Sequence, residues 1–364
     1  GIFKKRLLNG YAVPKAVFVD TTTGKEFNPH RPGIDNAVFP CECGGEMKRV
    51  KEVMDVWFDS GAMPFAQDHY PFENVGRVDD AGYPADFISE AIDQTRGWFY
   101  TLHAIGVLMG KGKAYKNVIC LGHILDADGK KMSKSLGNIV DPWLMMDKYG
   151  VDALRLWMYS VNQPGESKNF DEKTVDEIVK KFFNLLSNVL VFYGQYKNDV
   201  EHVDVDFRKS PHVLDEWILA LTDSLTQEVT EKLDAYQLFE PVRAIREFIA
   251  DFSQWYLRRS RERFKGEDVE DKKYALATTR HVLITLAKLL APFAPFYAES
   301  LYQALRREGK AESVHLAEWP EVSLKFKVKS SEVLGEMQEV RNMVSLGLEA
   351  RAKAGIKIRQ PLSS

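Results

Sequence analysis

The chain has 364 residues, a length that suggests two or three domains, and its hydrophobic fraction of 45% is sufficient for buried cores. Lys and Arg (49) nearly balance Asp and Glu (52), and the formal net charge of -3 excludes a uniformly basic surface. Any contact with nucleic acid therefore has to come from local patches. Three cysteines argue against a disulfide framework and favour a reducing compartment, which we expect to be the cytoplasm. The most apolar stretch, residues 282–296, is interrupted by Lys288, Pro292 and Pro295, so no membrane span is expected.

Cys41 and Cys43 lie in a Gly-rich segment, Cys-Glu-Cys-Gly-Gly. Structural zinc takes four ligands, commonly from two C-x-x-C pairs, whereas a single residue separates these cysteines. The remaining cysteine, Cys120, is distant in sequence, and His30 would be a further ligand. The pattern favours a structural turn with free thiols over a zinc site, so we expect no metal in this segment.

The first half of the chain has an α/β pattern, in which short apolar runs alternate with helical stretches. Residues 85–89 are predicted to end a strand, residues 95–109 to form a helix, and residues 118–122 to form a second, buried strand. This alternation is typical of parallel strands joined by crossover helices. In such sheets, ligands bind where the strands end. The polar residues that follow the two strands are Glu90, Asp93, Gln94 and His123.

Residues 131–135 read Lys-Met-Ser-Lys-Ser and follow a turn, Asp126-Ala127-Asp128-Gly129. Gly129 supplies the turn, and Ser133 and Ser135 add hydroxyl donors. A lysine is a point charge on a flexible stem, so two lysines in a loop suit a polyphosphate whose charge shifts during a reaction. We therefore interpret Lys131 and Lys134 as phosphate-binding residues.

The second half is predicted to be helical. Asp141 and Pro142 are typical of the N-cap and first turn of a helix that runs to Lys148, and Gly150 is placed to end it. From residue 151 onward, apolar residues recur at steps of three and four, which predicts a bundle of amphipathic helices. The predicted helices are 211–236, one that begins at Pro241, 274–290, 293–305 and 331–354, and the predicted connections are 162–171, 199–210 and 312–329.

Four arginines end the helix that begins at Pro241. Cations at a helix C-terminus suit the helix dipole, but four in six residues exceed what capping requires. Trp255 and Tyr256 lie one turn earlier, and a ring beside phosphate-binding arginines can stack on an unpaired RNA base. We therefore predict an RNA contact made by Arg258, Arg259, Arg261 and Arg263.

Several segments carry a family resemblance. Residues 122–138 read GHILDADGKKMSKSLGN, residues 55–61 read DVWFDSG, residues 90–98 read EAIDQTRGW, and residues 255–264 read WYLRRSRERF. The first resembles the signature of class I aminoacyl-tRNA synthetases. The others resemble segments of the isoleucyl-tRNA synthetases, with Ala91 where that family usually has glycine. Valyl enzymes share the first segment and differ at residues 55–61, and they remain an alternative.

The resemblance implies a function and roles for individual residues. It implies ATP-dependent activation of isoleucine to isoleucyl-adenylate and transfer to tRNA(Ile), with Mg²⁺ accompanying ATP. Lys131 and Lys134 would be the catalytic cations. Trp57, Asp59 and Trp98 would form the isoleucine pocket, since flat apolar rings suit a branched aliphatic side chain. The residues implied to bind ATP or the adenylate are Glu90, Asp93, Gln94, Gly122, His123, Met132, Ser133 and Ser135.

The resemblance also implies a fold. We expect part of a Rossmann-type parallel sheet followed by an all-α helical bundle. Residues 1–150 would be a partial catalytic domain, residues 151–320 a helical anticodon-binding domain, and residues 321–364 a connection with a truncated helical region. Residues 1–14 fall where the family has a segment that ends near R-Y-W-G, which is not recognisable here; Arg6 and Gly10 would be its remnants.

The H-x-G-H element and the large editing domain of these enzymes are not recognisable in the chain. We therefore expect the missing N-terminal half of the synthetase to be a partner and the isolated chain to be inactive in catalysis. The alternative is a tRNA-binding fragment without catalysis. An upstream reading frame that carries the H-x-G-H element would distinguish the two.

Overall fold

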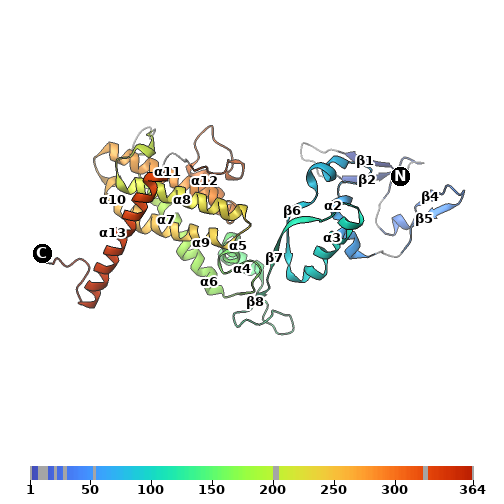
Figure 1. Ribbon diagram of the computed structural model, residues 1–364, viewed down its shortest axis with the longest axis horizontal. Coiled ribbons are helices and arrows are strands. Elements are labelled where there is room, and N and C mark those ends of the chain that lie inside the picture. The colour runs from blue at the N-terminus through green and yellow to red at the C-terminus, as the bar shows by residue number, and fades with distance from the viewer. Residues whose placement is uncertain are drawn as a thin grey trace. The chain divides into compact units, whose positions relative to one another are not determined.

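The computed structural model describes residues 2–6, 15–19, 23–27, 31–51, 55–199, 205–322 and 327–362. Their contacts divide the chain into two compact units. The first comprises residues 1–87 and 93–117, and the second comprises residues 88–92 and 118–364 (Figure 1). His30 and Gly10, which the sequence analysis singled out, lie outside the described residues.

The first unit begins with short antiparallel sheets that the sequence did not predict. One sheet has the order β1-β2-β3, and the other pairs β4 with β5. The strands are β1 (Ile2–Arg6), β2 (Lys15–Val19), β3 (Glu26–Phe27), β4 (Val38–Pro40) and β5 (Glu46–Lys48). The predicted Cys-Gly turn is confirmed, because it joins β4 to β5. Gly44, at φ +85°, adopts a conformation that favours glycine.

The rest of the first unit is mainly helical and packs around a small apolar core. Its elements are η1 (Gly33–Asn36), α1 (Val56–Gly61), α2 (Met63–Ala66), η2 (Arg77–Gly82), η3 (Ile92–Arg96) and α3 (Trp98–Leu108). Phe65, Val78 and Ile105 are buried together at this core. The predicted helix at residues 95–109 is therefore confirmed, with η3 as its 3₁₀ entry.

The two predicted strands pair with each other. β6 (Ala85–Ala91) and β7 (Tyr115–Leu121) form a two-stranded sheet. The prediction that the second strand is buried was wrong, because Val118 and Leu121 are 41% and 40% exposed. A pair of strands leaves much of both faces open, and burial in an α/β sheet requires further strands and covering helices.

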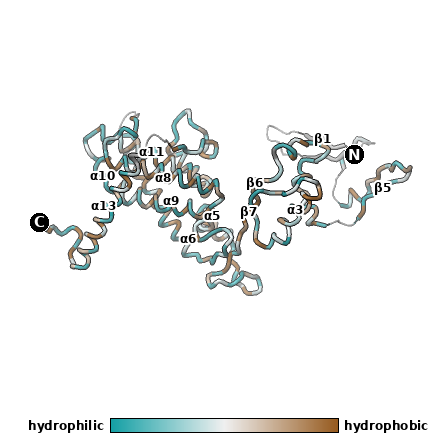
Figure 2. The backbone as a smooth tube through the Cα atoms, viewed as in Figure 1, coloured by the Kyte–Doolittle hydropathy of each residue, from teal (hydrophilic) through white to brown (hydrophobic). Residues whose placement is uncertain are grey.

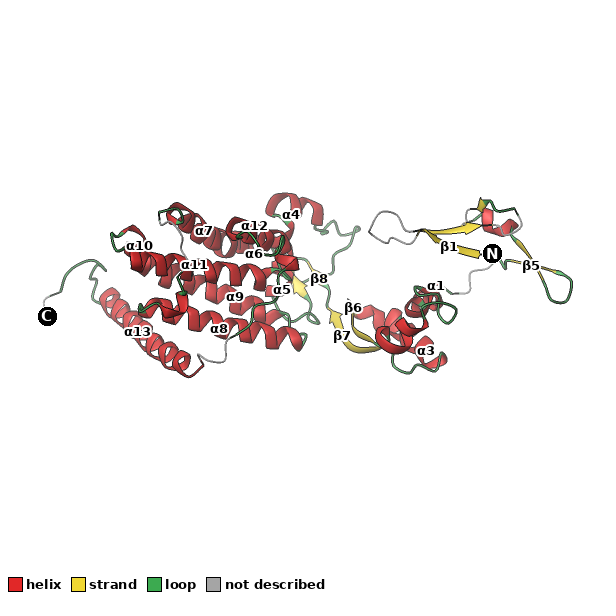
Figure 3. Cartoon of the chain, turned by 90° about the horizontal axis from the view of Figure 1, so that it is seen from above, coloured by secondary structure: helices red, strands yellow, loops and turns green. Residues whose placement is uncertain are grey.

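The second unit is a bundle of helices around one large hydrophobic core. α8, α9 and α11 run side by side, and α13 packs against α8 (Figure 3). Polar and apolar stretches alternate along these helices, as amphipathic packing requires (Figure 2). The helical elements are α4 (Pro142–Tyr149), α5 (Val151–Ser160), α6 (Glu172–Ile178), η4 (Val179–Phe183), α7 (Asn184–Tyr196), η5 (Phe207–Lys209), α8 (Val213–Asp234), α9 (Phe239–Asp251), η6 (Phe252–Leu257), α10 (Arg258–Lys265), α11 (Val269–Leu290), α12 (Pro295–Leu305), η7 (Val314–Leu316) and α13 (Lys327–Lys353). The predicted order, an α/β segment followed by a helical bundle, is confirmed.

Several helix boundaries follow local rules. Asp141 caps α4 by accepting a hydrogen bond from the Trp143 backbone N–H at 2.8 Å, and Gly150, at φ +84°, ends that helix. All three predicted connections contain short regular structure: β9 (Lys168–Asn169) lies within 162–171, η5 within 199–210 and η7 within 312–329. In addition, α13 begins at Lys327, before the predicted helix start.

The start of the bundle is tied to the link between α11 and α12. The Asp152 carboxylate accepts a hydrogen bond from the Tyr297 N–H at 2.6 Å. The Arg155 guanidinium donates to the carbonyls of Pro292 and Phe293 at 3.0 and 3.2 Å. These bonds connect positions more than 130 residues apart, so the segment that follows α4 is fixed to the bundle core. Within the described ranges, no helix is both long and apolar enough to cross a bilayer.

Candidate functional site

The signature loop, residues 126–138, is built on a tight turn. Gly129 has φ +78° and its N–H donates to the Asp126 carbonyl at 3.0 Å. One carboxylate oxygen of Asp126 accepts from the backbone N–H groups of Asp128 and Lys130, at 3.1 and 2.7 Å. A short polar side chain that binds its own backbone in this way fixes the turn locally.

Asn138 closes the loop from its other end. Its amide oxygen accepts from the Ser133 N–H at 2.9 Å. Its amide nitrogen donates to the second Asp126 oxygen at 2.8 Å and to the Lys131 carbonyl at 3.3 Å. The hydrogen bond from the Asn138 amide is the largest of the causes that lower the pKa of the Asp126 carboxyl. The Asp126 carboxylate therefore stays ionised and binds both ends of the loop.

The side chains between these ends divide into inward and outward positions. Met132 is half-buried and packs against the core of the helical bundle, so we assign it an anchoring role. The hydroxyls of Ser133 and Ser135 lie 3.1 Å apart, and the Leu136 N–H donates to the Ser133 hydroxyl at 3.3 Å. Gly137, at φ +66°, permits the second turn.

Lys131 and Lys134 are both exposed. In the part of the chain that the structure describes, neither ammonium group forms an ion pair or a hydrogen bond with the protein. The loop backbone is therefore fixed by Asp126 and Asn138, while both cations remain available to an anion. This arrangement suits a polyphosphate, because the charges need no rearrangement of the loop to reach it.

The segment before the loop is held by close backbone packing. Gly122 donates to the Pro164 carbonyl at 2.8 Å, and a Cβ at this glycine would collide with the Glu166 carbonyl. β8 (Ile124–Leu125) pairs in parallel with β9. The His123 carbonyl accepts from the Lys168 N–H at 2.8 Å, while the His123 side chain is exposed. Gly122 is thus needed for packing, whatever its role in ligand binding.

The two tryptophans of the predicted isoleucine pocket lie close together in the first unit. The Trp98 indole N–H donates to the Ser60 carbonyl at 3.1 Å. A Cβ at Gly97 would lie 3.0 Å from the ring of Trp57, so that ring rests on the start of α3. Trp57 remains 43% exposed, and its open face is available to an apolar ligand.

Two of the predicted polar residues, Asp93 and Gln94, lie in η3 just before α3. Gln94 accepts from the Trp98 N–H at 3.0 Å, and its amide nitrogen lies 3.5 Å from the Asp93 carboxylate. Glu90, the residue before the end of β6, has an exposed side chain, and Asp59 is exposed on α1. The sequence therefore located these groups near strand and helix ends, and Gln94 has a structural role that the motif did not indicate.

The four arginines predicted to bind RNA have different environments. Arg263 is buried in a double ion pair, with Asp215 at 2.7 Å and Asp271 at 2.7 Å, and its side chain is 8% exposed. The prediction that Arg263 contacts RNA was wrong, because both carboxylates occupy its donors. By contrast, Arg258, Arg259 and Arg261 are exposed.

Two of the exposed arginines rest on aromatic rings. The Arg259 guanidinium lies 3.2 Å from the centroid of a Trp255 ring, and burial together with Arg258 and Arg341 lowers its pKa. Arg261 lies 5.9 Å from the ring centroid of Phe192. Arg258 forms no ion pair or hydrogen bond with the described residues through its side chain. We define Arg258, Arg259 and Arg261 as the arginine surface.

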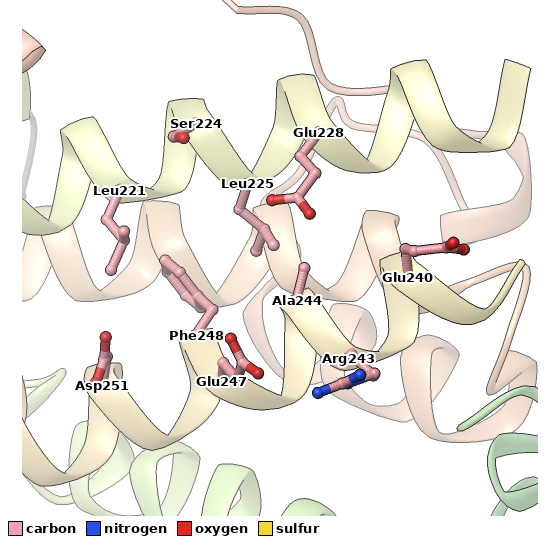
Figure 4. A pocket seen from close by; sticks show the side chains of 10 residues that line it. All are labelled: Leu221, Ser224, Leu225, Glu228, Glu240, Arg243, Ala244, Glu247, Phe248 and Asp251. Carbon is pink, nitrogen blue, oxygen red and sulfur yellow. The ribbon is translucent and has the colours of Figure 1, made fainter. Parts of the chain in front are cut away.

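An acidic groove of about 350 Å³ lies between α8 and α9 (Figure 4). Its carboxylates hold neighbouring segments: Asp251 binds Arg341 of α13 at 2.8 Å, and Glu240 accepts from Gln163 at 2.8 Å. The carboxylates that line it are Glu228, Glu240, Glu247 and Asp251. This groove would repel phosphate, so it does not extend the arginine surface.

The two cysteines of the β4–β5 turn lie with their sulfur atoms 3.1 Å apart, and both are free thiols. The hydrogen bond with Cys41 is the largest cause that lowers the pKa of Cys43. Among the described residues, no group of three or more His, Cys, Asp or Glu side chains is arranged to hold a metal.

Sequence reasoning missed the residues that hold the signature loop in place. Asp126 was interpreted only as part of a turn, and Asn138 was assigned no role. A signal was present, because Asp and Asn favour hydrogen bonds to nearby backbone at turns and flank the lysines here. The pairing of β8 with β9 had no comparable signal, since two-residue strands carry no periodicity.

Comparisons with known proteins agree with this geometry. Residues 23–171 match the family model of the class I tRNA synthetases (I, L, M and V). Residues 215–364 match the anticodon-binding domain of tRNA ligases. An isoleucine–tRNA ligase of Thermus thermophilus is 46% identical over 344 residues, which cover 92% of this chain and 33% of that protein. One from Dehalococcoides mccartyi strain 195 is 45% identical over 343 residues, covering 92% and 34%.

The chain therefore spans about a third of the length of the curated relatives it matches. Solved structures share the fold at lower identity. The ternary complex of Agrobacterium radiobacter K84 agnB2 LeuRS, tRNA and LeuAMS has a TM-score of 0.60 at 19% identity, covering 79% of this chain and 36% of that one. Methionyl-tRNA synthetase of Mycobacterium tuberculosis with methionyl-adenylate has a TM-score of 0.56 at 22% identity, covering 72% and 53%. By its signature loop, its matched family models and its relatives, this chain belongs to the class I tRNA synthetases.

Proposed function

We propose that this chain is part of an isoleucine–tRNA ligase, which activates isoleucine with ATP and transfers it to tRNA(Ile). The observation that carries the proposal is the signature loop, whose backbone is fixed while Lys131 and Lys134 remain unpaired among the described residues. The relatives named isoleucine–tRNA ligase support the choice of amino acid.

The proposed chemistry begins with attack of an isoleucine carboxylate oxygen on the α-phosphorus of ATP. The bond from this phosphorus to the bridging oxygen breaks, and pyrophosphate leaves with the negative charge. Lys131 and Lys134 stabilise that charge, with Lys134 as the more direct contact. Mg²⁺ would accompany ATP as the metal of the substrate.

The other candidate residues have proposed roles in substrate binding. Trp57 and Trp98 would bound the isoleucine side chain, with Asp59 beside them. Groups that can accept from or donate to the adenosine and the amino group are Glu90, Asp93, Gln94, His123, Ser133 and Ser135.

We also propose a division of labour along the chain. Residues 1–150 would carry the activation chemistry, residues 151–320 would bind the anticodon arm, and residues 321–364 would form a connection. The arginine surface lies in the second of these segments.

We expect Trp57→Ala or Trp98→Ala, in the native gene product, to weaken isoleucine binding by about tenfold, which corresponds to about 1.4 kcal/mol of lost apolar contact. ATP binding should change less than twofold, because the rings contact an aliphatic side chain. The matched control is Trp143→Ala, which removes a 72% exposed tryptophan of α4. The measurement is ATP–pyrophosphate exchange as a function of each substrate, and an equal loss for both substrates would assign the rings to the core.

We expect Arg258→Gln with Arg261→Gln to weaken binding of the chain to a tRNA(Ile) transcript. The slope of log affinity against log salt should become shallower by about one to two, because up to two phosphate contacts are lost. Lys180→Gln with Lys181→Gln, on η4, makes the same change in net charge as a control. Filter binding between about 50 and 200 mM salt measures both quantities. Equal slopes for both double variants would remove the arginine surface from the RNA interface.

A further inference from the structure

A second cationic site lies in the helical unit, away from the signature loop and the arginine surface. We propose that the cavity between η5, α11 and the end of α12, with a volume of about 360 Å³, binds a phosphate group. Hereafter it is called the basic cavity. Its lining residues are Val205, Phe207, Ala277, Arg280, His281, Ile284, Lys288, Tyr302, Arg306, Arg307 and Lys310.

The charges around this cavity have one sign. Five of the lining residues are Lys or Arg, and no described residue that lines it is Asp or Glu. The Asp223 carboxylate of α8 does not line the cavity and forms a bidentate pair with Arg208 of η5, at 2.9 and 3.0 Å. A concave surface with an excess of positive charge concentrates anions.

Two of the three guanidinium groups that line the cavity are positioned by neutral acceptors. Arg280 donates one hydrogen bond to the Leu305 carbonyl at 2.6 Å, and Arg306 donates to the Gln303 side-chain oxygen at 3.2 Å. A guanidinium has five N–H donors, so each group keeps donors for a ligand. Neutral acceptors hold the groups in place without cancelling their charge, which suits bidentate binding of phosphate oxygens.

Part of the cavity lining is formed by two stacked, uncharged rings. Phe207 stacks on His281 with ring centroids 4.2 Å apart. Burial, followed by the charge of Arg208, lowers the pKa of His281 to about 4, so this ring is neutral at physiological pH. Burial and the neighbouring Arg307 lower the pKa of Arg280, as expected where cations face one another. Uncharged rings beside the cations lower the local dielectric constant, which strengthens the attraction of the cations for an anion.

The ligand chemistry is a phosphate group, and two sources can supply it. A free phosphate, such as pyrophosphate, would enter the cavity whole. A backbone phosphate of RNA would reach it while the rest of the RNA stays outside. The inference does not depend on the proposed ligase function, because it rests on residues that take no part in the proposed chemistry.

The test measures pyrophosphate binding by isothermal titration calorimetry, on a chain that also carries Lys131→Gln and Lys134→Gln. This background removes the contribution of the signature loop. Arg306→Gln with Lys310→Gln should raise the dissociation constant at least tenfold, while Lys180→Gln with Lys181→Gln should leave it within twofold. Lys288→Gln provides a second variant within the cavity if the first double variant shows an altered helical circular dichroism.

A second arm measures binding of a tRNA(Ile) transcript by the same variants. Loss of pyrophosphate binding with unchanged RNA binding identifies a free phosphate as the ligand. Loss of both, with competition between them, identifies a backbone phosphate. Unchanged affinity for both ligands in the double variant and in Lys288→Gln overturns the proposal.

Discussion

Arg263→Ala is expected to lower the free energy of unfolding of the helical unit by about 3–5 kcal/mol, the cost of removing one partner of a buried ion pair. The side chain of Asp215 is 0% exposed, and Arg263 pairs with both of its oxygens, at 2.7 and 2.8 Å. Removal of the guanidinium leaves a buried carboxylate without its cation. Urea unfolding followed by circular dichroism at 222 nm measures the change.

Other groups around Asp215 do not replace the lost cation. The Tyr256 hydroxyl donates to Asp215 at 2.7 Å, and the Ser210 hydroxyl donates at 2.6 Å. Both are neutral, and burial raises the pKa of Tyr256. Arg263→Ala with Asp215→Asn should therefore regain part of the stability, because no charge is left buried. Arg258→Ala, an exposed control on the same helix, should change stability by less than about 0.5 kcal/mol. An Arg263→Ala chain as stable as this control would contradict the structural role.

Lys134→Ala is expected to lower the rate of adenylate formation in the native gene product by about tenfold to a thousandfold, the scale for loss of one group that stabilises charge in the transition state. The affinity for isoleucine should barely change, because the contact proposed for this lysine is with phosphate. The side chain is exposed, so its removal leaves the bonds of Asp126 and Asn138 intact. Single-turnover formation of pyrophosphate gives the rate, and its dependence on isoleucine gives the affinity.

Two controls separate this role from loop folding. Lys173→Ala removes an exposed lysine of α6 and should leave the rate unchanged. Asn138→Ala should lower the rate without removing a cation, because it releases one end of the signature loop. If Lys134→Ala weakened isoleucine binding as much as it slowed the reaction, the effect would reflect misfolding and not phosphate stabilisation.

Features set by local sequence were predictable. The cap at Asp141 and the helix end at Gly150 depend on neighbouring residues, and both were identified correctly. The amphipathic stripes of α8, α11 and α12 predicted a bundle because apolar spacing is itself the packing signal. The signature loop was recognised from its lysines, serines and turn glycine.

Features set by distant partners were not predictable. Arg263 looked like its exposed neighbours, and its burial depends on Asp215, which lies 48 residues away in sequence. The strand β7 looked buried because its residues are apolar, although exposure depends on how many strands and helices accompany it. The basic cavity joins η5 to α11 and α12, so no local pattern indicated that these cations converge.

The most direct test of the proposed function is amino-acid-dependent ATP–pyrophosphate exchange by the native gene product, with isoleucine, valine, leucine and methionine compared. We predict that the exchange rate with isoleucine exceeds the rate with each of the other three amino acids. We also predict that Lys134→Ala lowers the rate with isoleucine by about tenfold to a thousandfold. Exchange that prefers another amino acid, or that is unaffected by Lys134→Ala, would contradict the assignment of this chain to isoleucine activation.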